Sequence, residues 1–277
     1  MIRQRTTTLG CAVVTLCIVS TLALAAGLPT VLALHFSDMS PQLPLPAQPL
    51  SWAPETVAPE VPASAWLWQR GWERVWPLLV EGRALQLAFA GPPAQRYLRL
   101  AADKAFTVWA HRLTVDPQQQ PILAITWAVE RFPVDAALDL PGRNDRAIAV
   151  IVSLGPKLPS DGLRPAVPRG LAFFWGETET VGTTYTCIPP RQGLTGDRLQ
   201  CVYPHIKYIA LRRGGAGTVQ TDYVNLLEVF QQQFPDYWQE HHQVPPIVGV
   251  SFEARSDRTA SLAIARLYSV TFQAAQD

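Results

Sequence analysis

The sequence carries almost no net charge and has no dense cluster of basic residues. It contains 23 Lys and Arg against 22 Asp and Glu, which gives a formal net charge of +1. Arg3 and Arg5 supply two of the positive charges, so the rest of the chain is at −1. Binding of a phosphate backbone needs clustered Lys and Arg. The composition therefore argues against nucleic acid as a partner.

Familiar catalytic and metal-binding motifs are also missing. The sequence has no His-Glu-x-x-His, Gly-x-Ser-x-Gly or P-loop pattern and no Cys-x-x-Cys pair. Of its five histidines only His241 and His242 are adjacent, and neighbours on a strand or helix point apart. We therefore predict no catalytic residue, no metal and no cofactor. A glycosidase would need two carboxylates about 5 to 9.5 Å apart, and the candidates are Glu130, Glu177, Glu179 and Glu253.

What is present begins with an apolar N-terminal segment, residues 1–36. A short basic start precedes the run Leu9 to Phe36, which contains no Lys, Arg, Asp or Glu. Ala23-Leu24-Ala25 offers a signal-peptidase site. However, Leu9 to Leu28 already has the length of roughly 20 residues that a membrane helix needs, and Pro29 would end it. A cleaved signal and an uncleaved inner-membrane anchor both stay open. Either one places the body in the cell envelope, outside the cytoplasm.

Cysteine is scarce, with four in 277 residues. Cys11 and Cys17 fall in the apolar segment, and the body contains Cys187 and Cys201 alone. In an oxidising compartment we predict a disulfide between this last pair. It would close a loop of roughly 15 residues and stabilise the fold by about 3 kcal/mol. The alternative is two separate buried thiols.

Proline is abundant, with 25 in the chain. Seven of them fall between Pro41 and Pro62, which predicts an extended, polyproline-like spacer over residues 37–63. Such a spacer would hold the body away from a bilayer. The alternative is a proline-rich arm that lies along the surface of the body.

Four of the nine tryptophans lie in the stretch AWLWQRGWERVW, residues 65–76. Ser64 is a good N-cap and Pro77 would stop a helix, so the stretch predicts a helix from Ala65 to Trp76. Gly71 counts against it by about 1 kcal/mol relative to Ala. On this helix one face would carry Trp68, Trp72 and Trp76. Three roles are open for this face: packing against the body, contact with a membrane surface, and a glycan platform.

From residue 84 onward the apolar residues alternate, as in half-buried strands. A hairpin is predicted from 105–115 and 122–132, with Trp109 and Trp127 in the core and His111 half-buried. The run 146–155 is apolar on both faces and predicts a central strand.

Further strands are expected on either side of one helix, at about Tyr223 to Phe234, capped by Thr221 or Asp222. A final strand pair is predicted around the turn RSDRT, residues 255–259. The fold class is all-β: a two-sheet antiparallel β-sandwich of jelly-roll type with one or two short helices, over residues 64–277.

Four segments in order are PILAITWAVERFP, NDRAIAVIVSLG, LAFFWG and VGVSFEARSDRTASLAIARLYSVTF. Their order and spacing over about Ala84 to Phe272 resemble the bacterial domain-of-unknown-function 3047 family. The resemblance implies an exported β-sandwich and brings no known reaction with it. The terminal strand pair is also similar to that of carbohydrate-binding jelly rolls, although only Asp257 places an acidic group at the turn.

Sugar binding needs exposed aromatic planes beside polar side chains. The residues selected as candidates for such a site are Trp175, Glu177, Tyr185, Tyr203 and Asp257. The sequence thus favours a non-catalytic envelope module that binds a glycan or an envelope protein and contacts the membrane through its N-terminal segment. Two alternatives remain: a carbohydrate-active enzyme with a carboxylate pair, and a purely structural subunit of an envelope assembly.

Overall fold

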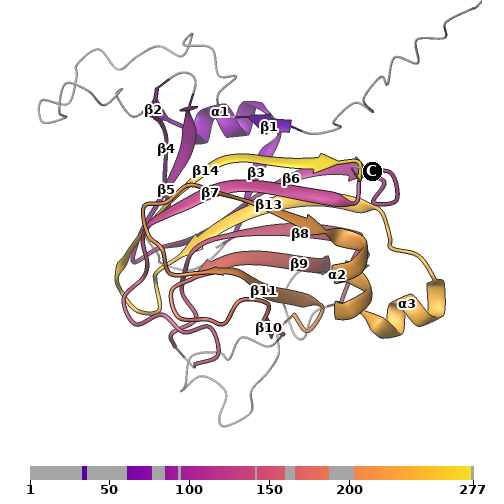
Figure 1. The fold of residues 1–277 in the computed structure, drawn as a ribbon. Helices are drawn as coiled ribbons and strands as arrows, with labels where there is room; N and C mark the ends of the chain where they lie inside the picture. Colours follow the sequence, from indigo (N-terminus) through magenta and orange to yellow (C-terminus); the bar gives the residue numbers. More distant parts are fainter. Residues whose placement is uncertain are drawn as a thin grey trace, which may run out of the picture.

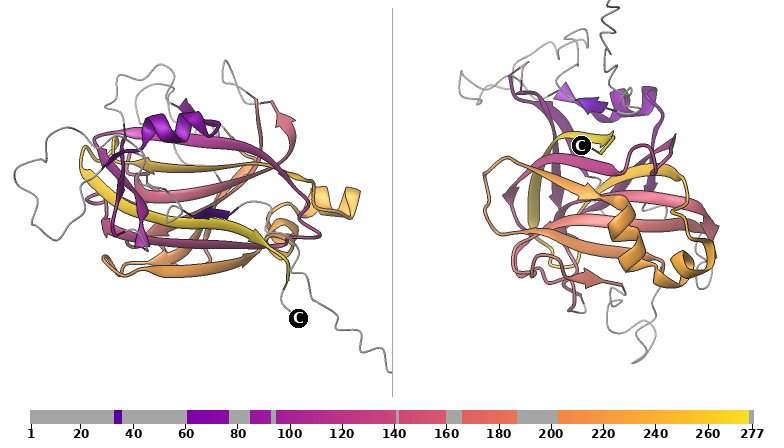
Figure 2. Two further views of the ribbon diagram at one scale, coloured as in Figure 1. Left: turned by 90° about the horizontal axis from the view of Figure 1, so that it is seen from above. Right: turned by 45° about the vertical axis from the view of Figure 1, so that its right-hand side comes forward.

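Two β-sheets, each of seven strands, face one another across a single apolar interior (Figure 1). The computed structural model describes residues 33–35, 61–76, 85–92, 95–140, 142–159, 166–186 and 203–275. Within these ranges strands dominate and three helices are short, so the predicted two-sheet β-sandwich of jelly-roll type is confirmed. Figure 2 shows the two layers from two further directions.

The first sheet, sheet A, has the order β12-β7-β14-β5-β4-β2, and β1 pairs with β14 beside this path. Its strands are β1 (Ala33–His35), β2 (Val61–Pro62), β4 (Gln86–Ala90), β5 (Tyr97–Asp103), β7 (Ile122–Arg131), β12 (Gln220–Asn225) and β14 (Leu262–Gln273). All of its pairings are antiparallel.

The second sheet, sheet B, has the order β10-β11-β9-β8-β13-β6-β3. Its strands are β3 (Trp72–Trp76), β6 (Phe106–Val115), β8 (Arg146–Leu158), β9 (Val167–Gly176), β10 (Thr184–Tyr185), β11 (Ile206–Arg213) and β13 (Ile247–Arg255). One pairing, β11 with β9, is parallel. β8 lies between β9 and β13, which confirms the central strand predicted from its two apolar faces.

The interior is built from alternate side chains of both sheets, as the pleat requires. Trp127 from sheet A and Trp109 from sheet B are both buried there, as predicted. Trp127 meets Trp175 edge to face, with ring centroids 5.9 Å apart. Burying each large apolar side chain contributes about 1.5–3 kcal/mol, so this interior is the main source of stability.

Helices close the two open sides of the sandwich. α1 (Ser64–Gln69) connects β2 of sheet A to β3 of sheet B. On the opposite side, α2 (Leu226–Gln233) and α3 (Pro235–His241) follow β12, and Phe230 of α2 is fully buried. In Figure 1, α1 lies above the strands and α2 lies beside their right-hand ends.

The helix predicted from Tyr223 begins later than expected. Residues 220–225 pair with β7 as β12, and the side chain of Asn225 caps α2 by accepting from the backbone N–H groups of Leu227 and Glu228. The cap is therefore Asn225 rather than Thr221 or Asp222. Tyr223 lies in a strand rather than in the helix because the strand buries its neighbour Val224 in the sandwich interior.

The single helix predicted over residues 65–76 is wrong. The helix ends at Gln69, and Gly71 adopts a φ of 78°, a left-handed conformation that glycine reaches without strain. The chain then continues as β3, which pairs with β6. Trp72 is 2% exposed and packs on His111 and Phe252, whereas Trp68 is 65% exposed. The two tryptophans therefore share no helical face.

Both predicted strand pairs are wrong in the same way. β6 belongs to sheet B and β7 to sheet A, so the turn after Asp116 crosses between the sheets instead of closing a hairpin. The turn 256–261 likewise carries the chain from β13 in sheet B to β14 in sheet A. Facing sheets lie about 10 Å apart, which a loop of six residues spans easily. Alternation alone does not tell such a crossover from a hairpin.

The N-terminal segment and the proline-rich segment both contribute strands to sheet A. Residues 33–35 pair with 269–271 of β14, and Val61–Pro62 pairs with Ala88–Phe89 of β4. Within the described ranges no helix is long and apolar enough to cross a membrane. The segment before Ala33 and the predicted disulfide between Cys187 and Cys201 lie outside the described residues.

Candidate functional site

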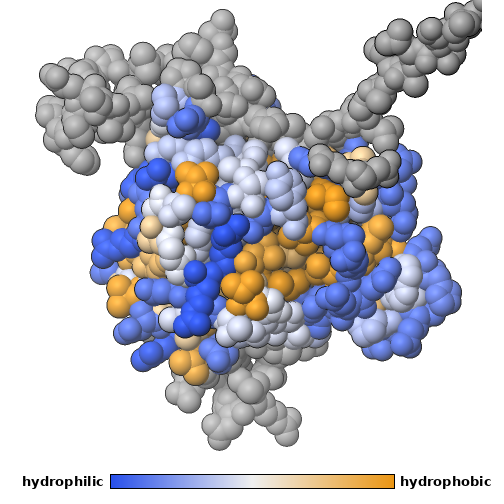
Figure 3. All heavy atoms as spheres, viewed as in Figure 1, coloured by the Kyte–Doolittle hydropathy of each residue, from blue (hydrophilic) through white to orange (hydrophobic). Residues whose placement is uncertain are grey.

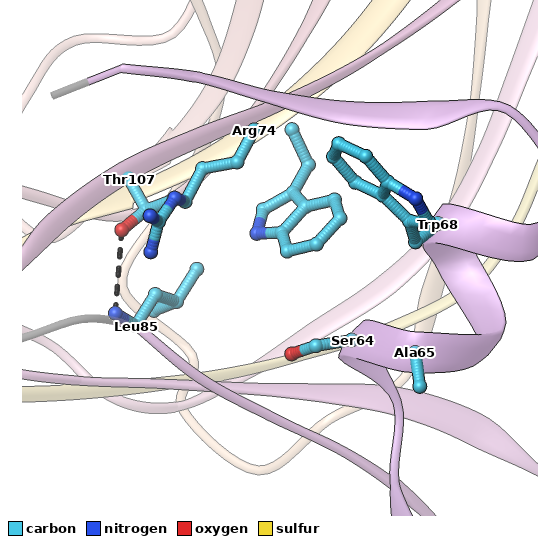
Figure 4. Close-up of a pocket in the computed structure, with 7 residues that line it drawn as sticks. Ser64, Ala65, Trp68, Arg74, Leu85 and Thr107 are labelled. Atoms are coloured by element: carbon cyan, nitrogen blue, oxygen red, sulfur yellow. Dashed lines mark hydrogen bonds between the residues drawn. The ribbon is translucent and has the colours of Figure 1, made fainter. Parts of the chain in front are cut away.

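A cavity of about 360 Å³ lies beside α1 and is open to solvent (Figure 4). Its volume lies in the lower part of the roughly 300–1,000 Å³ range usual for small-molecule sites. The lining combines apolar and polar side chains from α1, from sheet B and from the residue just before β4: Ser64, Ala65, Trp68, Arg74, Leu85, Thr107 and Trp109.

The orientation of α1 presents Trp68 to this cavity. Ala63 and Leu67, four residues apart, are both fully buried and fix one side of the helix against the sandwich. Ser64 and Trp68 have the same spacing and lie on the neighbouring side, where both line the cavity. Figure 4 shows the indole of Trp68 projecting from α1 at one end of the hollow. Trp68 thus offers an exposed aromatic plane at the cavity wall.

The register of β3 places Arg74 on the core-facing side of sheet B. Arg74 lies opposite Trp109, and the same row continues across the sheet through Phe252, Val150 and Phe173. All members of the row except Arg74 are buried. An arginine at the end of an apolar row would be costly if it were enclosed. Because β3 is the edge strand, the guanidinium reaches the open cavity instead.

The cavity is supported by a hydrogen bond between the sheets. The backbone N–H of Leu85, just before β4, donates to Oγ1 of Thr107 on β6 at 3.3 Å (Figure 4). Thr107 is itself buried beside the core. Among the residues the structure describes, Arg74 forms no ion pair and no hydrogen bond. The cavity therefore presents an indole plane, a second indole at its base and an uncommitted guanidinium.

The candidate carboxylates for a glycosidase are engaged elsewhere. Glu253 is buried in an ion pair with Arg146, and Glu130 pairs with Arg266. Glu179 accepts from the backbone N–H groups of Leu138, at 3.1 Å, and of Thr178, at 3.3 Å. Glu177 is exposed. In the described part of the chain none of the four lies in the cavity beside α1.

The outer face of sheet B carries a second, smaller core. It consists of Leu138, Ala149, Phe174 and Ala210, with Tyr185 and Tyr208 packed against it. Leu138 comes from the β7–β8 connection, so this connection covers the sheet there.

Beside this second core, Nε of Arg146 donates to Glu253 and its NH2 group donates to the hydroxyl of Tyr208 at 3.2 Å. Burial by itself would lower the pKa of Arg146, but Glu253, Tyr208 and Asp145 together outweigh burial, and the pKa is raised. Burial also raises the pKa of Tyr208. Arg146 and Glu253 are buried and Tyr208 is half-buried, so this network is suited to holding the fold rather than to meeting a ligand.

The residues predicted to bind a ligand occupy several distinct environments. Trp175 is buried, and its Nε1 donates to the carbonyl of Gly214 at 2.6 Å. Tyr185 is half-buried against Phe174 on the other face of the same sheet. Burial and the Glu179 carboxylate raise the pKa of Tyr185.

Tyr203 is half-buried next to His205, with ring centroids 6.0 Å apart. Asp257 lies in the β13–β14 turn and accepts from Arg255 at 2.7 Å. With Glu177 exposed, the five residues do not converge on one cavity, and their role in binding stays a prediction. Arg74 was not predicted as a site residue from the sequence. The signal that could have indicated it is its position between two tryptophans in WERVW.

The fold and the cavity define an all-β sandwich protein with one aromatic–cationic hollow at an open side. The model of a family described as "Protein of unknown function (DUF3047)" matches residues 88–271. The chain belongs to this family, as the resemblance in the sequence predicted. Trp68, Arg74 and Leu85 lie outside the matched range, and Thr107 and Trp109 lie inside it. A comparison with curated proteins finds no match.

Among solved structures, the chain is similar to the xyloglucanase domain of NopAA, a type three effector from Sinorhizobium fredii, in complex with cellobiose. That match has 11% identity, a TM-score of 0.37, and covers 74% of this chain and 95% of the other. It is also similar to endoglucanase cel12A from Rhodothermus marinus, at 14% identity and a TM-score of 0.33, covering 74% and 93%. Similarity at this level carries no argument about activity.

Proposed function

We propose that the protein is an exported, non-catalytic glycan-binding module of the bacterial cell envelope and that the cavity beside α1 is its binding site. The observation that carries the proposal is the exposed indole of Trp68 above a hollow that also contains Trp109, Arg74 and Ser64. A sugar ring presents C–H groups to an aromatic plane and hydroxyls to polar neighbours, and the cavity offers both kinds of surface.

The export part of the proposal rests on the sequence. The basic start, the uncharged run from Leu9 to Phe36 and the Ala23-Leu24-Ala25 site are those of a signal or an anchor. N-terminal sequencing of the protein from an envelope fraction tests both alternatives. A start at Ala26 supports a cleaved signal, an intact Met1 in a membrane fraction supports the anchor, and recovery in the cytosol refutes export.

Binding is tested with the purified protein on an array of bacterial and plant polysaccharides, followed by calorimetry on the best ligand. Trp68→Ala should weaken binding by about tenfold, since aromatic stacking contributes roughly 0.5–1.5 kcal/mol beyond the area that it buries. The matched control is Tyr223→Ala, which removes another aromatic side chain, 69% exposed, from the opposite edge of the sandwich. It should leave binding unchanged.

Because Trp68 is largely exposed, its removal should leave the unfolding midpoint unchanged, and this is measured on the same samples. Absence of any polysaccharide whose binding depends on Trp68 would refute the proposed function. Release of reducing sugar from a bound polysaccharide would favour the enzyme alternative over a purely binding role.

A further inference from the structure

We infer that the glycan bound beside α1 is an acidic one, whose anionic group pairs with Arg74 while its sugar ring lies on Trp68. This inference rests on the proposed function and names the ligand class of the same site. The juxtaposition that supports it is an arginine on the core-facing row of sheet B, at the end of that row on the edge strand β3, beside the exposed Trp68.

The first step of the argument concerns why Arg74 is on that row. Trp72, two residues earlier on the same face of β3, is buried against His111 and Phe252, as the alternation of a sandwich strand requires. The alternation of buried and exposed side chains along β3 predicts another apolar residue at position 74, but the residue there is an arginine. An apolar side chain would extend the interior over Trp109, whereas the guanidinium leaves the hollow open and charged.

The second step concerns the partner of that charge. Of the described residues that line the cavity, Arg74 is the one with an ionisable side chain. Within the described residues no carboxylate neutralises it. A guanidinium presents a planar fork of N–H donors that matches the two oxygens of a carboxylate, or those of a sulfate or phosphate ester. A neutral sugar would leave this fork paired only with hydroxyls.

The third step concerns spacing across the hollow. Trp68 and Arg74 come from different elements and line the same cavity of about 360 Å³, and Figure 4 shows Arg74 extending toward Leu85 and Thr107 while Trp68 lies at the other end. One residue of an oligosaccharide can therefore stack at one end while its acidic substituent, or that of the next residue, reaches the other. A uronic acid polymer and a sulfated glycan share this chemistry.

The experiment uses pairs of probes that differ only in charge. Oligomers of galacturonate, mannuronate and glucuronate are each compared with their methyl esters, and sulfated oligosaccharides with their desulfated forms, by calorimetry with the purified protein. The charged member of at least one pair should bind about tenfold or more tightly than the neutral member, because a hydrogen bond to a charged group corresponds to a factor of roughly 10 to 100. The difference should shrink at high salt.

Two variants assign the charge preference to its residue. Arg74→Gln should remove the preference while keeping whatever affinity the neutral probe has. Arg70→Gln is the matched control, because it removes the same charge from an exposed arginine four residues away that does not line the cavity. Arg74→Lys keeps the charge without the planar fork and should recover part of the preference.

The outcomes separate this inference from the proposed function. Equal affinities within every pair, with Trp68-dependent binding intact, would overturn the acidic ligand and leave the glycan module standing. A charge preference that survives Arg74→Gln would also overturn it. Absence of Trp68-dependent binding to any probe or arrayed glycan would overturn both.

Discussion

The buried Arg146–Glu253 pair allows a quantitative test of how sheet B is held together. Both side chains are 2% exposed, and Arg146 also donates to the carbonyl of Asn144 at 3.0 Å and to Tyr208. Removing one member leaves an uncompensated charge inside the protein, which typically costs about 3–5 kcal/mol. Arg146→Met and Glu253→Leu should each lower the free energy of unfolding by that amount.

The double variant should behave differently from the sum of the two. With Arg146→Met and Glu253→Leu together, no charge stays buried, so the loss should be smaller than for either single variant. For a domain of this size about 1 kcal/mol corresponds to roughly 2–4 °C in the unfolding midpoint. The single variants should therefore melt roughly 6–20 °C lower, and the double variant should recover much of this difference.

A matched control is available in sheet A. Arg266 and Glu130 form an ion pair between neighbouring strands too, but their side chains are 29% and 23% exposed. Arg266→Met should cost about 1 kcal/mol or less from the ion pair itself. The measurement is thermal unfolding followed by circular dichroism, with urea midpoints as a second readout. If Arg146→Met costs no more than Arg266→Met, or if the two losses in sheet B simply add, the reasoning is refuted.

Two further predictions concern single side chains. Trp72→Ala should lower the free energy of unfolding by about 3–5 kcal/mol because it empties a filled site, whereas Trp68→Ala should cost under about 1 kcal/mol; equal losses in urea titrations would contradict the assigned burial. Burial raises the pKa of Tyr208 above its ordinary 10.0, so the folded chain keeps a proton that the unfolded chain releases, and stability should fall as pH rises beyond about 10. Tyr208→Phe should flatten this decline between pH 9 and 11 and Tyr223→Phe should not; identical slopes would disprove the assignment.

Periodicity was enough to predict the sandwich, because burial acts on every second residue of a strand regardless of its partner. The doubly apolar run 146–155 had to be a central strand, and Trp109 and Trp127 had to point inward. Strand partners were less predictable. The six residues after Val115 could close a hairpin or cross to the facing sheet. Which of the two occurs depends on the strands with which β6 and β7 pair, and those partners, β13 and β14, are distant in sequence.

The candidate site was harder still to predict, because it exists only through the β3–β6 register. The spacing of Trp68, Trp72 and Trp76 fits a helix as well as it fits a helix followed by a strand. Gly71 was the local signal that the helix ends before Trp72. It could not be interpreted with certainty from the sequence, because its left-handed conformation arises only when the following residues join the sheet. Only after β3 pairs with β6 does Arg74 come to lie beside Trp109.

The pairing of β1 with β14 bears on whether the proline-rich run can act as a spacer between the membrane and the sandwich. Because β1 and β2 are both strands of sheet A, the residues between them begin and end on the same sheet, and their length does not set how far the body stands from whatever precedes β1. With an uncleaved anchor ending at Leu28, the five steps to Ala33 span at most about 17 Å. The sandwich would then rest against the bilayer. In Figure 1, α1 lies on the same side as β1, and the cavity is lined by residues of α1.

On that side of the molecule the binding site would sample glycans close to the membrane rather than those deep in the envelope. The opposite side, where α2 and β11 lie, would face away from the lipid, and Figure 3 shows apolar surface over the strands near β11 in the view of Figure 1. With cleavage after Ala25 the same strand would stay in the mature protein as its first structural element. Cleavage before β1 would therefore decide whether the proposed module works at a fixed height above the membrane or moves freely through the envelope.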